Sequence, residues 1–155
     1  MSRVISSTAC VEIFEGIINV SKSRGIKPVA ISICDPSGIE LASLRLDGCP
    51  PASFPSFAKA KAKTAVALGC SSREFKARYE EMKPWQMMFM AQSQGLAPFP
   101  GGIVVKSAAD GEVLGSVGVS GASSDEDEYL AISGVRSASS LVDITTEPAE
   151  HKLND

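Results

Sequence analysis

The chain has 155 residues, of which 44% are hydrophobic and 21% are charged, and its net charge is −3 at pH 7. This length is typical of one domain whose core needs no disulfide or metal for stability, and the acidic balance argues against a nucleic-acid or anionic-membrane partner. No apolar run reaches the ~18 residues of a membrane-spanning helix and the first residues lack a secretory pattern, so we expect a soluble, cytoplasmic protein.

The first predicted elements are a helix and a β-hairpin. Apolar side chains recur at three- and four-residue intervals over residues 8–24 and Gly25 follows, which predicts a helix with a glycine stop. Gly16 lowers the helix propensity and indicates a closely packed neighbour. The β-branched run 29–34 and the alternating run 39–46 flank a proline- and glycine-containing turn, as in a hairpin.

Three helices are predicted in the middle of the chain. Residues 56–68 are rich in alanine and precede Gly69, so this helix can lie close to a sheet or to a partner helix. A serine at 71 or 72 caps a third helix of about ten residues that ends before Pro84. Residues 85–94 form a further helical turn or two. Their tryptophan, phenylalanine and methionine side chains are expected in the core, with a pocket wall or subunit contact as the alternative.

The second half of the chain contains the clearest hairpin. Residues 103–106 and 112–120 flank Asp110-Gly111, a dipeptide suited to a turn with positive φ. A last helix begins at Ser123 or Ser124 and runs to about Ser140. Two hairpins with interspersed helices predict an α+β fold in which helices cover an antiparallel sheet.

Residues 1–144 are expected to form a single domain and residues 145–155 a polar, flexible tail. The one histidine, His151, lies in that tail, so a Ser–His or Cys–His catalytic pair is not expected. The four cysteines include no C-x-x-C pair and are interpreted as buried free thiols.

Two polar motifs have both a functional and a structural interpretation. Glycines at 115, 118 and 121 suggest a phosphate loop, but the acidic residues 125–128 open the next helix and would repel phosphate, so close strand packing and a helix cap are favoured. Among those acids only Asp125 and Glu128 share a helix face, and no metal site is predicted. Lysines 59, 61 and 63 fan around their helix, and the pattern does not choose which of them faces a pocket.

Five motifs in this order resemble those of the GlcG/HbpS-like family. They are residues 29–38 with 44–48, residues 58–65 with Gly69, residues 95–102, residues 111–121, and Glu126-Asp127, where the family commonly has glutamine at the first position. The resemblance covers residues 8–134. It implies a profilin-like fold with a five-stranded antiparallel sheet and helices, and assembly as dimers or larger rings. The family includes proteins linked to glycolate use, haem-binding and haem-degrading proteins, and a domain attached to cobalamin adenosyltransferases.

The resemblance makes haem or a related tetrapyrrole the leading ligand. We expect the pocket between Lys61, the loop Phe99-Pro100-Gly101-Gly102 and a wall containing Met87 and Met88, with Arg45 as a further ligand-binding candidate. Glycine backbone N–H groups and the Lys61 ammonium would bind a carboxylate there. Without a histidine in the folded region, Cys34, a methionine or a hydroxyl would have to replace an imidazole ligand of haem iron.

The alternative is a cofactor-independent enzyme acting on a small organic acid or carbonyl compound. Lys61 would be its acid–base or electrostatic group, and the N–H groups of Gly101 and Gly102 would stabilise an oxyanion. Arg45 and Asp47 are candidates to orient substrate, although a structural ion pair is favoured for them.

A homo-oligomer is expected under either function. The alanine-rich face of residues 56–68 and the Ile13/Ile17 side of the first helix offer more apolar surface than one small sheet needs to cover. Such a surface is typical of an isologous dimer interface. On this interpretation Ala62→Arg would split the oligomer.

Overall fold

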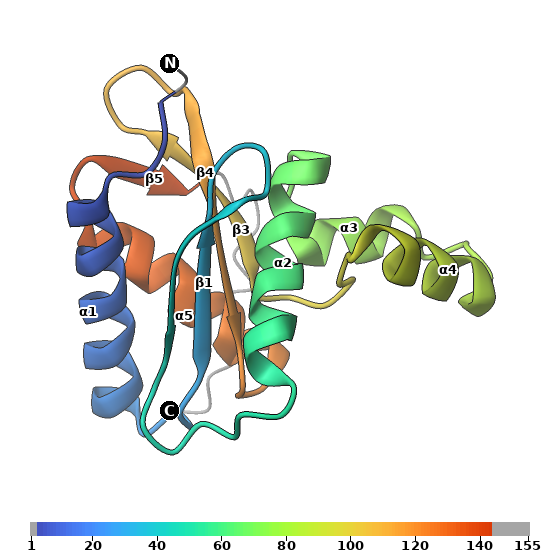
Figure 1. Ribbon diagram of the computed structural model, residues 1–155, viewed down its shortest axis with the longest axis horizontal. Coiled ribbons are helices and arrows are strands. Elements are labelled where there is room, and N and C mark those ends of the chain that lie inside the picture. Colours follow the sequence, from blue (N-terminus) through green and yellow to red (C-terminus); the bar gives the residue numbers. More distant parts are fainter. Residues whose placement is uncertain (1–2, 144–155) are drawn as a thin grey trace.

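The computed structural model describes residues 3–143, which form a five-stranded antiparallel sheet with helices against both faces (Figure 1). The strand order is β2-β1-β4-β3-β5. In chain order the elements are α1 (Ser7–Arg24), β1 (Ala30–Cys34), β2 (Glu40–Arg45), α2 (Phe54–Leu68), α3 (Ser72–Arg78), α4 (Pro84–Gln94), β3 (Gly102–Ser107), β4 (Val113–Ser120), α5 (Ser124–Ser137) and β5 (Leu141–Asp143). The predicted α+β class and the five-stranded sheet are confirmed. No helix in this part of the chain is both long and apolar enough to cross a membrane.

The main core lies between the sheet and the helices α1 and α5. Alternate strand residues such as Ile31 and Val117 point to this face and are fully buried together with Ile13 and Ile17 of α1. The two helices cross closely because both carry glycine at the crossing. A Cβ on Gly16 would lie 2.1 Å from the Ser137 hydroxyl oxygen. The close neighbour predicted for Gly16 is therefore α5.

The other face of the sheet is covered by α2, which lies unusually close to β4. A Cβ on Gly118 would lie 2.0 Å from the carbonyl oxygen of Ala58, so only glycine fits beneath this helix. Ala58, Ala62 and Ala65 are fully buried against the strands. The glycines of β4 thus serve close strand packing, as favoured above, and the Ser123 and Glu126 side chains form the expected capping box at the start of α5.

This packing corrects the predicted oligomer interface. The alanine face of α2 and the Ile13/Ile17 side of α1 are interior surfaces of the same chain, with no exposed area left for a partner. The sequence interpretation failed because a helix face suited to close approach looks the same whether a sheet or a partner helix covers it.

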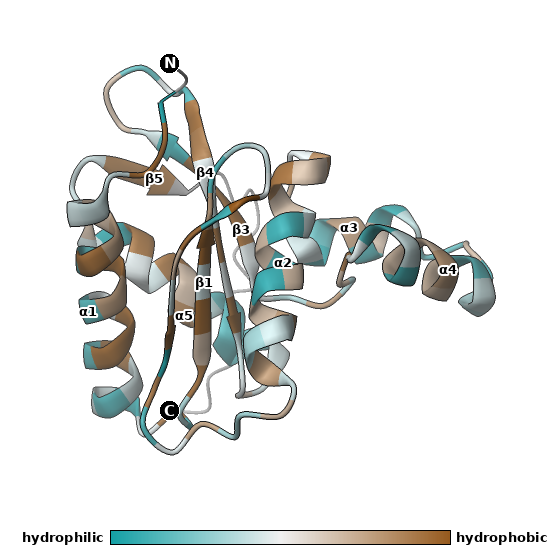
Figure 2. Ribbon diagram, in the orientation of Figure 1, coloured by the Kyte–Doolittle hydropathy of each residue, from teal (hydrophilic) through white to brown (hydrophobic). Residues whose placement is uncertain are grey.

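A further apolar surface lies on α4, which projects away from the sheet (Figure 1). None of its residues is buried, and the exposed fractions of Trp85, Met88 and Phe89 are 65%, 70% and 70%. Hydrophobic stretches therefore stand clear of the body of the chain (Figure 2). The prediction that this segment packs in the core is wrong, because α3 carries it beyond the edge of α2.

Two other elements differ from the prediction. The third helix is shorter than expected, since only its first residues pack on the domain and Ser72 and Phe75 are its buried positions. The last helix ends at Ser137 rather than near Ser140, and β5 follows it unpredicted. Three residues are too few to show a strand pattern, and β5 forms because Leu141 enters the core beside β3. The predicted tail at 145–155 lies outside the described residues.

Candidate functional site

A cleft of about 160 Å³ opens where α2, β4, the start of α5 and the loop before β3 meet. Its lining combines two aromatic rings, two hydroxyls and an ion pair. The lining residues are Phe57, Lys61, Phe99, Ser120, Ala122, Ser124 and Asp127. Two of the predicted site residues, Lys61 and Phe99, therefore lie in one cleft.

The base of the cleft is a buried ion pair between α2 and α5. The Lys61 Nζ donates to Asp127 Oδ2 at 2.9 Å and to the Val119 carbonyl at 3.0 Å, while Asp127 Oδ1 accepts from the Ala122 N–H at 2.9 Å. The exposed fractions of the Lys61 and Asp127 side chains are 5% and 3%. An ammonium has three donors and two are used here, so one hydrogen of Lys61 remains for a ligand.

The protonation behaviour of the pair follows from its burial. Loss of hydration raises the pKa of Asp127, and the neighbouring Lys61 charge and the backbone N–H groups oppose this rise. A carboxyl group whose proton affinity is increased in a cleft is suited to exchange a proton with a ligand. Asp127 was predicted only as part of a family motif and an acidic helix start, so its role beside Lys61 was missed.

The two phenylalanines form the outer walls. Phe57 lies one helical turn before Lys61, and Phe99 precedes the glycines of the loop. Their exposed fractions of 48% and 52% leave about half of each ring for contact with a ligand. Phe57 was not among the predicted site residues, although its spacing of four residues from Lys61 places both on the same helix face.

The loop glycines allow Lys61 to pack closely against the loop. A Cβ on Gly101 would lie 2.9 Å from Lys61 Cδ, and one on Gly102 would lie 2.1 Å from the Lys61 carbonyl oxygen. The Gly102 N–H donates to the buried hydroxyl of Ser72 at 2.8 Å, so it is not available to stabilise an oxyanion. Pro100 is buried next to them. The predicted oxyanion role is wrong for Gly102.

The remaining predicted site residues lie elsewhere. Arg45 ends the edge strand β2 and lines a separate groove with the end of α1. Met87 and Met88 lie on the projecting helix α4 and do not line the cleft. Cys34 is fully buried, as all four free cysteines are, and burial raises the pKa of its thiol. The prediction of buried free thiols is confirmed.

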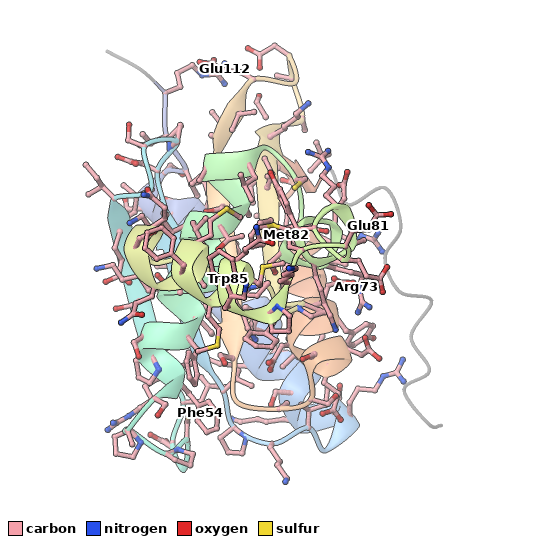
Figure 3. The ribbon with its side chains drawn as sticks, turned by 90° about the vertical axis from the view of Figure 1, so that its right-hand side faces the viewer. Phe54, Arg73, Glu81, Met82, Trp85 and Glu112 are labelled. Atoms are coloured by element: carbon pink, nitrogen blue, oxygen red, sulfur yellow. The ribbon has the colours of Figure 1, made fainter. Side chains whose placement is uncertain are left out.

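The acidic start of α5 serves to anchor α3. Arg73 Nε donates to the fully buried Glu128 at 3.0 Å, and the same guanidinium pairs with Asp125. Figure 3, in which α4 points toward the viewer, labels both Arg73 and Trp85. Asp125 and Glu128 do share a helix face, as predicted, and the cation that they bind is a side chain.

Comparison with known proteins identifies similar folds over nearly the whole chain. The profile of the family described as haem-degrading protein HbpS-like matches residues 5–136. A structure of a PduOC–haem complex is 22% identical, covering 86% of this chain and 94% of that chain, with a TM-score of 0.75. The structure of Klebsiella pneumoniae protein ORFY is 22% identical, covering 90% of this chain and 93% of that chain, with a TM-score of 0.77. A double mutant of Streptomyces reticuli HbpS is 27% identical, covering 86% of each chain, with a TM-score of 0.72. The comparison with curated proteins gave no match.

Proposed function

Because the chain belongs to the HbpS-like family of haem-degrading proteins, we propose that it binds a small molecule, with haem or a related tetrapyrrole as the leading ligand. The observation that carries this proposal is a pair of half-exposed phenylalanine rings above a buried ammonium group. Aromatic rings stack on a flat macrocycle, and the free hydrogen of Lys61 can bind one of its carboxylates.

The size of the cleft determines how such a ligand would bind. About 160 Å³ is below the roughly 300 Å³ at which pockets begin to enclose a drug-sized molecule. A tetrapyrrole would therefore insert one carboxylate-bearing edge and lie with the rest of its ring against Phe57 and Phe99. This mode uses the organic part of the ligand alone.

The described residues do not provide a ligand for haem iron at this cleft. Its lining contains no histidine, cysteine, methionine or tyrosine, which are the usual axial ligands. Cys34, named above as a substitute, is buried as a thiol, and Met88 lies on α4. His151 falls outside the described residues. We therefore derive no iron chemistry and propose that affinity does not depend on the metal.

The test is a spectroscopic titration with hemin and with metal-free protoporphyrin IX. Both should bind saturably with affinities within about threefold of each other, because iron makes no contact. The double variant Phe57→Ser/Phe99→Ser should bind both about tenfold more weakly, since two aromatic contacts of roughly 0.5–1.5 kcal/mol are lost. Val11→Ser is the matched control, because Val11 is 53% exposed on the opposite face. A Soret band identical to that of free hemin, or an unchanged affinity of the double variant, would contradict the proposal.

A second candidate is a cofactor-independent enzyme, and the buried Lys61–Asp127 pair favours it. A carboxyl group with a raised pKa beside an ammonium can move a proton to or from a small organic acid or carbonyl compound in the cleft. The assay is exchange of C–H protons in D₂O, followed by NMR over a panel of 2-hydroxy and 2-keto acids. Exchange should fall about 10²-fold in Asp127→Asn. Equal exchange by wild type and variant would exclude this candidate.

We also propose that the chain forms a homo-oligomer, through a different surface from the one expected above. The exposed Trp85, Met88 and Phe89 of α4 form an apolar segment on a helix with no buried residue against residues 3–143. Such surfaces mark association sites in soluble proteins.

A further inference from the structure

We propose that the groove between the end of α1 and the edge strand β2 is a second binding site, which takes a small amphipathic carboxylate. The groove has a volume of about 550 Å³, within the range of small-molecule pockets. It lies on the α1 side of the domain and shares no lining residue with the cleft around Lys61. This inference is independent of the function proposed for that cleft.

The floor of the groove is apolar. Ile18 of α1 and Leu44 and Leu46 of the β2 segment are half-buried and face the groove together. The groove exists because α1 passes over the edge strand β2 without covering these side chains completely. An apolar chain or ring lying there would bury surface that water now covers, at about 25 cal/mol per Å².

The rim of the groove is basic. Lys22 and Lys27 are exposed around it, and Asp47 is the single carboxylate in the lining. Arg45 contributes only its place on the strand, because its side chain alternates to the α2 face beside Lys59. Within residues 3–143, neither Lys22 nor Lys27 forms an ion pair. A net positive rim in a chain with a net charge of −3 is a local feature, and it selects an anion.

The loop that forms one wall is already fixed. Gly25 has a φ of 63° and caps α1, with its N–H bound to the Lys22 and Ser21 carbonyls. The Ile26 N–H donates to the Ser21 carbonyl, and the Ser21 hydroxyl donates to the Ile26 carbonyl. Because the last carbonyls of α1 are paired in this way, the wall is rigid before a ligand arrives and less binding energy is lost to ordering it.

These features together identify the ligand class. The apolar floor requires a hydrocarbon body, while the ammonium groups of Lys22 and Lys27 at the rim favour an anionic head such as a carboxylate. A polyphosphate would satisfy the cations and leave the floor uncovered. A neutral apolar molecule would cover the floor and leave the cations unused.

The test compares octanoate with 1-octanol, which has the same chain length and no charge. Calorimetry should show saturable binding of octanoate that weakens as salt rises to about 0.5 M, and much weaker binding of octanol. The double variant Lys22→Gln/Lys27→Gln should weaken octanoate binding about tenfold, because both cations of the rim are lost. Lys76→Gln, an exposed lysine on α3, is the matched control and should bind octanoate as wild type does.

Hydrogen-exchange mass spectrometry locates the site. Saturating octanoate should protect peptides covering residues 18–28 and 43–48. The Phe57→Ser/Phe99→Ser variant should bind octanoate normally, and Lys22→Gln/Lys27→Gln should bind hemin normally, so either proposal can fail without the other. Equal affinity for octanoate and octanol, protection confined to the Lys61 cleft, or no saturable binding would overturn the inference.

Discussion

Removal of the Lys61 charge should strongly destabilise the fold. In Lys61→Met the side chain keeps its length, and Asp127, at 3% exposure, is left as a buried carboxylate without its counter-ion. Breaking a buried pair in this way costs about 3–5 kcal/mol of unfolding free energy. The Val119 carbonyl also loses a donor at 3.0 Å, which contributes about 1 kcal/mol within that loss.

The deficit in unfolding free energy of Lys61→Met, relative to wild type, should depend on pH with a defined sign. Burial raises the pKa of Asp127, so the folded state holds this proton more tightly than the unfolded state does. The group therefore favours the folded state below its ordinary pKa, and this contribution is lost as pH rises through the folded-state value. Without the Lys61 charge, which opposes the rise in the Asp127 pKa, more stability is lost as pH rises. The deficit of Lys61→Met should thus be smallest near pH 4 and largest near pH 7, over about the range of carboxyl titration.

Urea unfolding of four proteins at several pH values measures these effects. Lys63→Met is the matched control, since Lys63 is exposed two residues along the same helix, and it should change the free energy by less than about 0.5 kcal/mol. The double variant Lys61→Met/Asp127→Leu should recover most of the loss, because an apolar pair can replace a buried ion pair at little cost. A Lys61→Met deficit under about 1 kcal/mol, or one that does not shrink in acid, would show that Asp127 is not a buried charge.

Three further outcomes follow from the packing and the exposed surfaces. Ala62→Arg should abolish soluble folded protein, as seen by circular dichroism, because Ala62 is fully buried between α2 and β4 and a charge there has no partner. A folded, dissociated variant would restore the dimer interpretation. Thr64→Val should lower the urea-derived unfolding free energy by about 1–3 kcal/mol, since the Thr64 hydroxyl accepts the N–H of the loop before β3 at 2.8 Å. Serine at all three exposed apolar positions of α4, Trp85, Met88 and Phe89, should reduce the mass seen by light scattering without lowering the unfolding free energy; a wild-type mass near 16 kDa at micromolar concentration would exclude the oligomer.

The fold was largely predictable because its signals are local. Helix α1 ends at Gly25 and the second hairpin turns at Gly111, and both glycines adopt the positive φ that their positions require. The three residues of β5 carry no comparable signal. The position of α4 also has no local signal, since its tryptophan and methionines look the same in sequence whether a core or solvent surrounds them.

The candidate site was predictable only in part, because its residues come together through tertiary packing. Lys61 and the Phe99–Gly102 loop were expected together, and the structure places them together. The pattern of three fanned lysines did not distinguish Lys61, since the choice depends on which helix face the glycines of β4 admit. Arg45 was named as a further ligand contact, but it ends the edge strand β2 away from the Lys61 cleft, and the sequence does not show how far apart two residues lie on the sheet.

The same packing determines how a ligand can be bound in the Lys61 cleft and in the α1–β2 groove. Among the buried residues of α2, Lys61 alone is long and charged, and Asp127 already neutralises it at 2.9 Å. A carboxylate entering the cleft therefore gains a hydrogen bond and aromatic contact but little net charge attraction, so its affinity should vary weakly with salt. In the α1–β2 groove the cations are exposed and unneutralised by described carboxylates, and there the affinity for an anion should fall steeply with salt. The salt dependence of binding thus distinguishes the two sites even for a ligand that both accept.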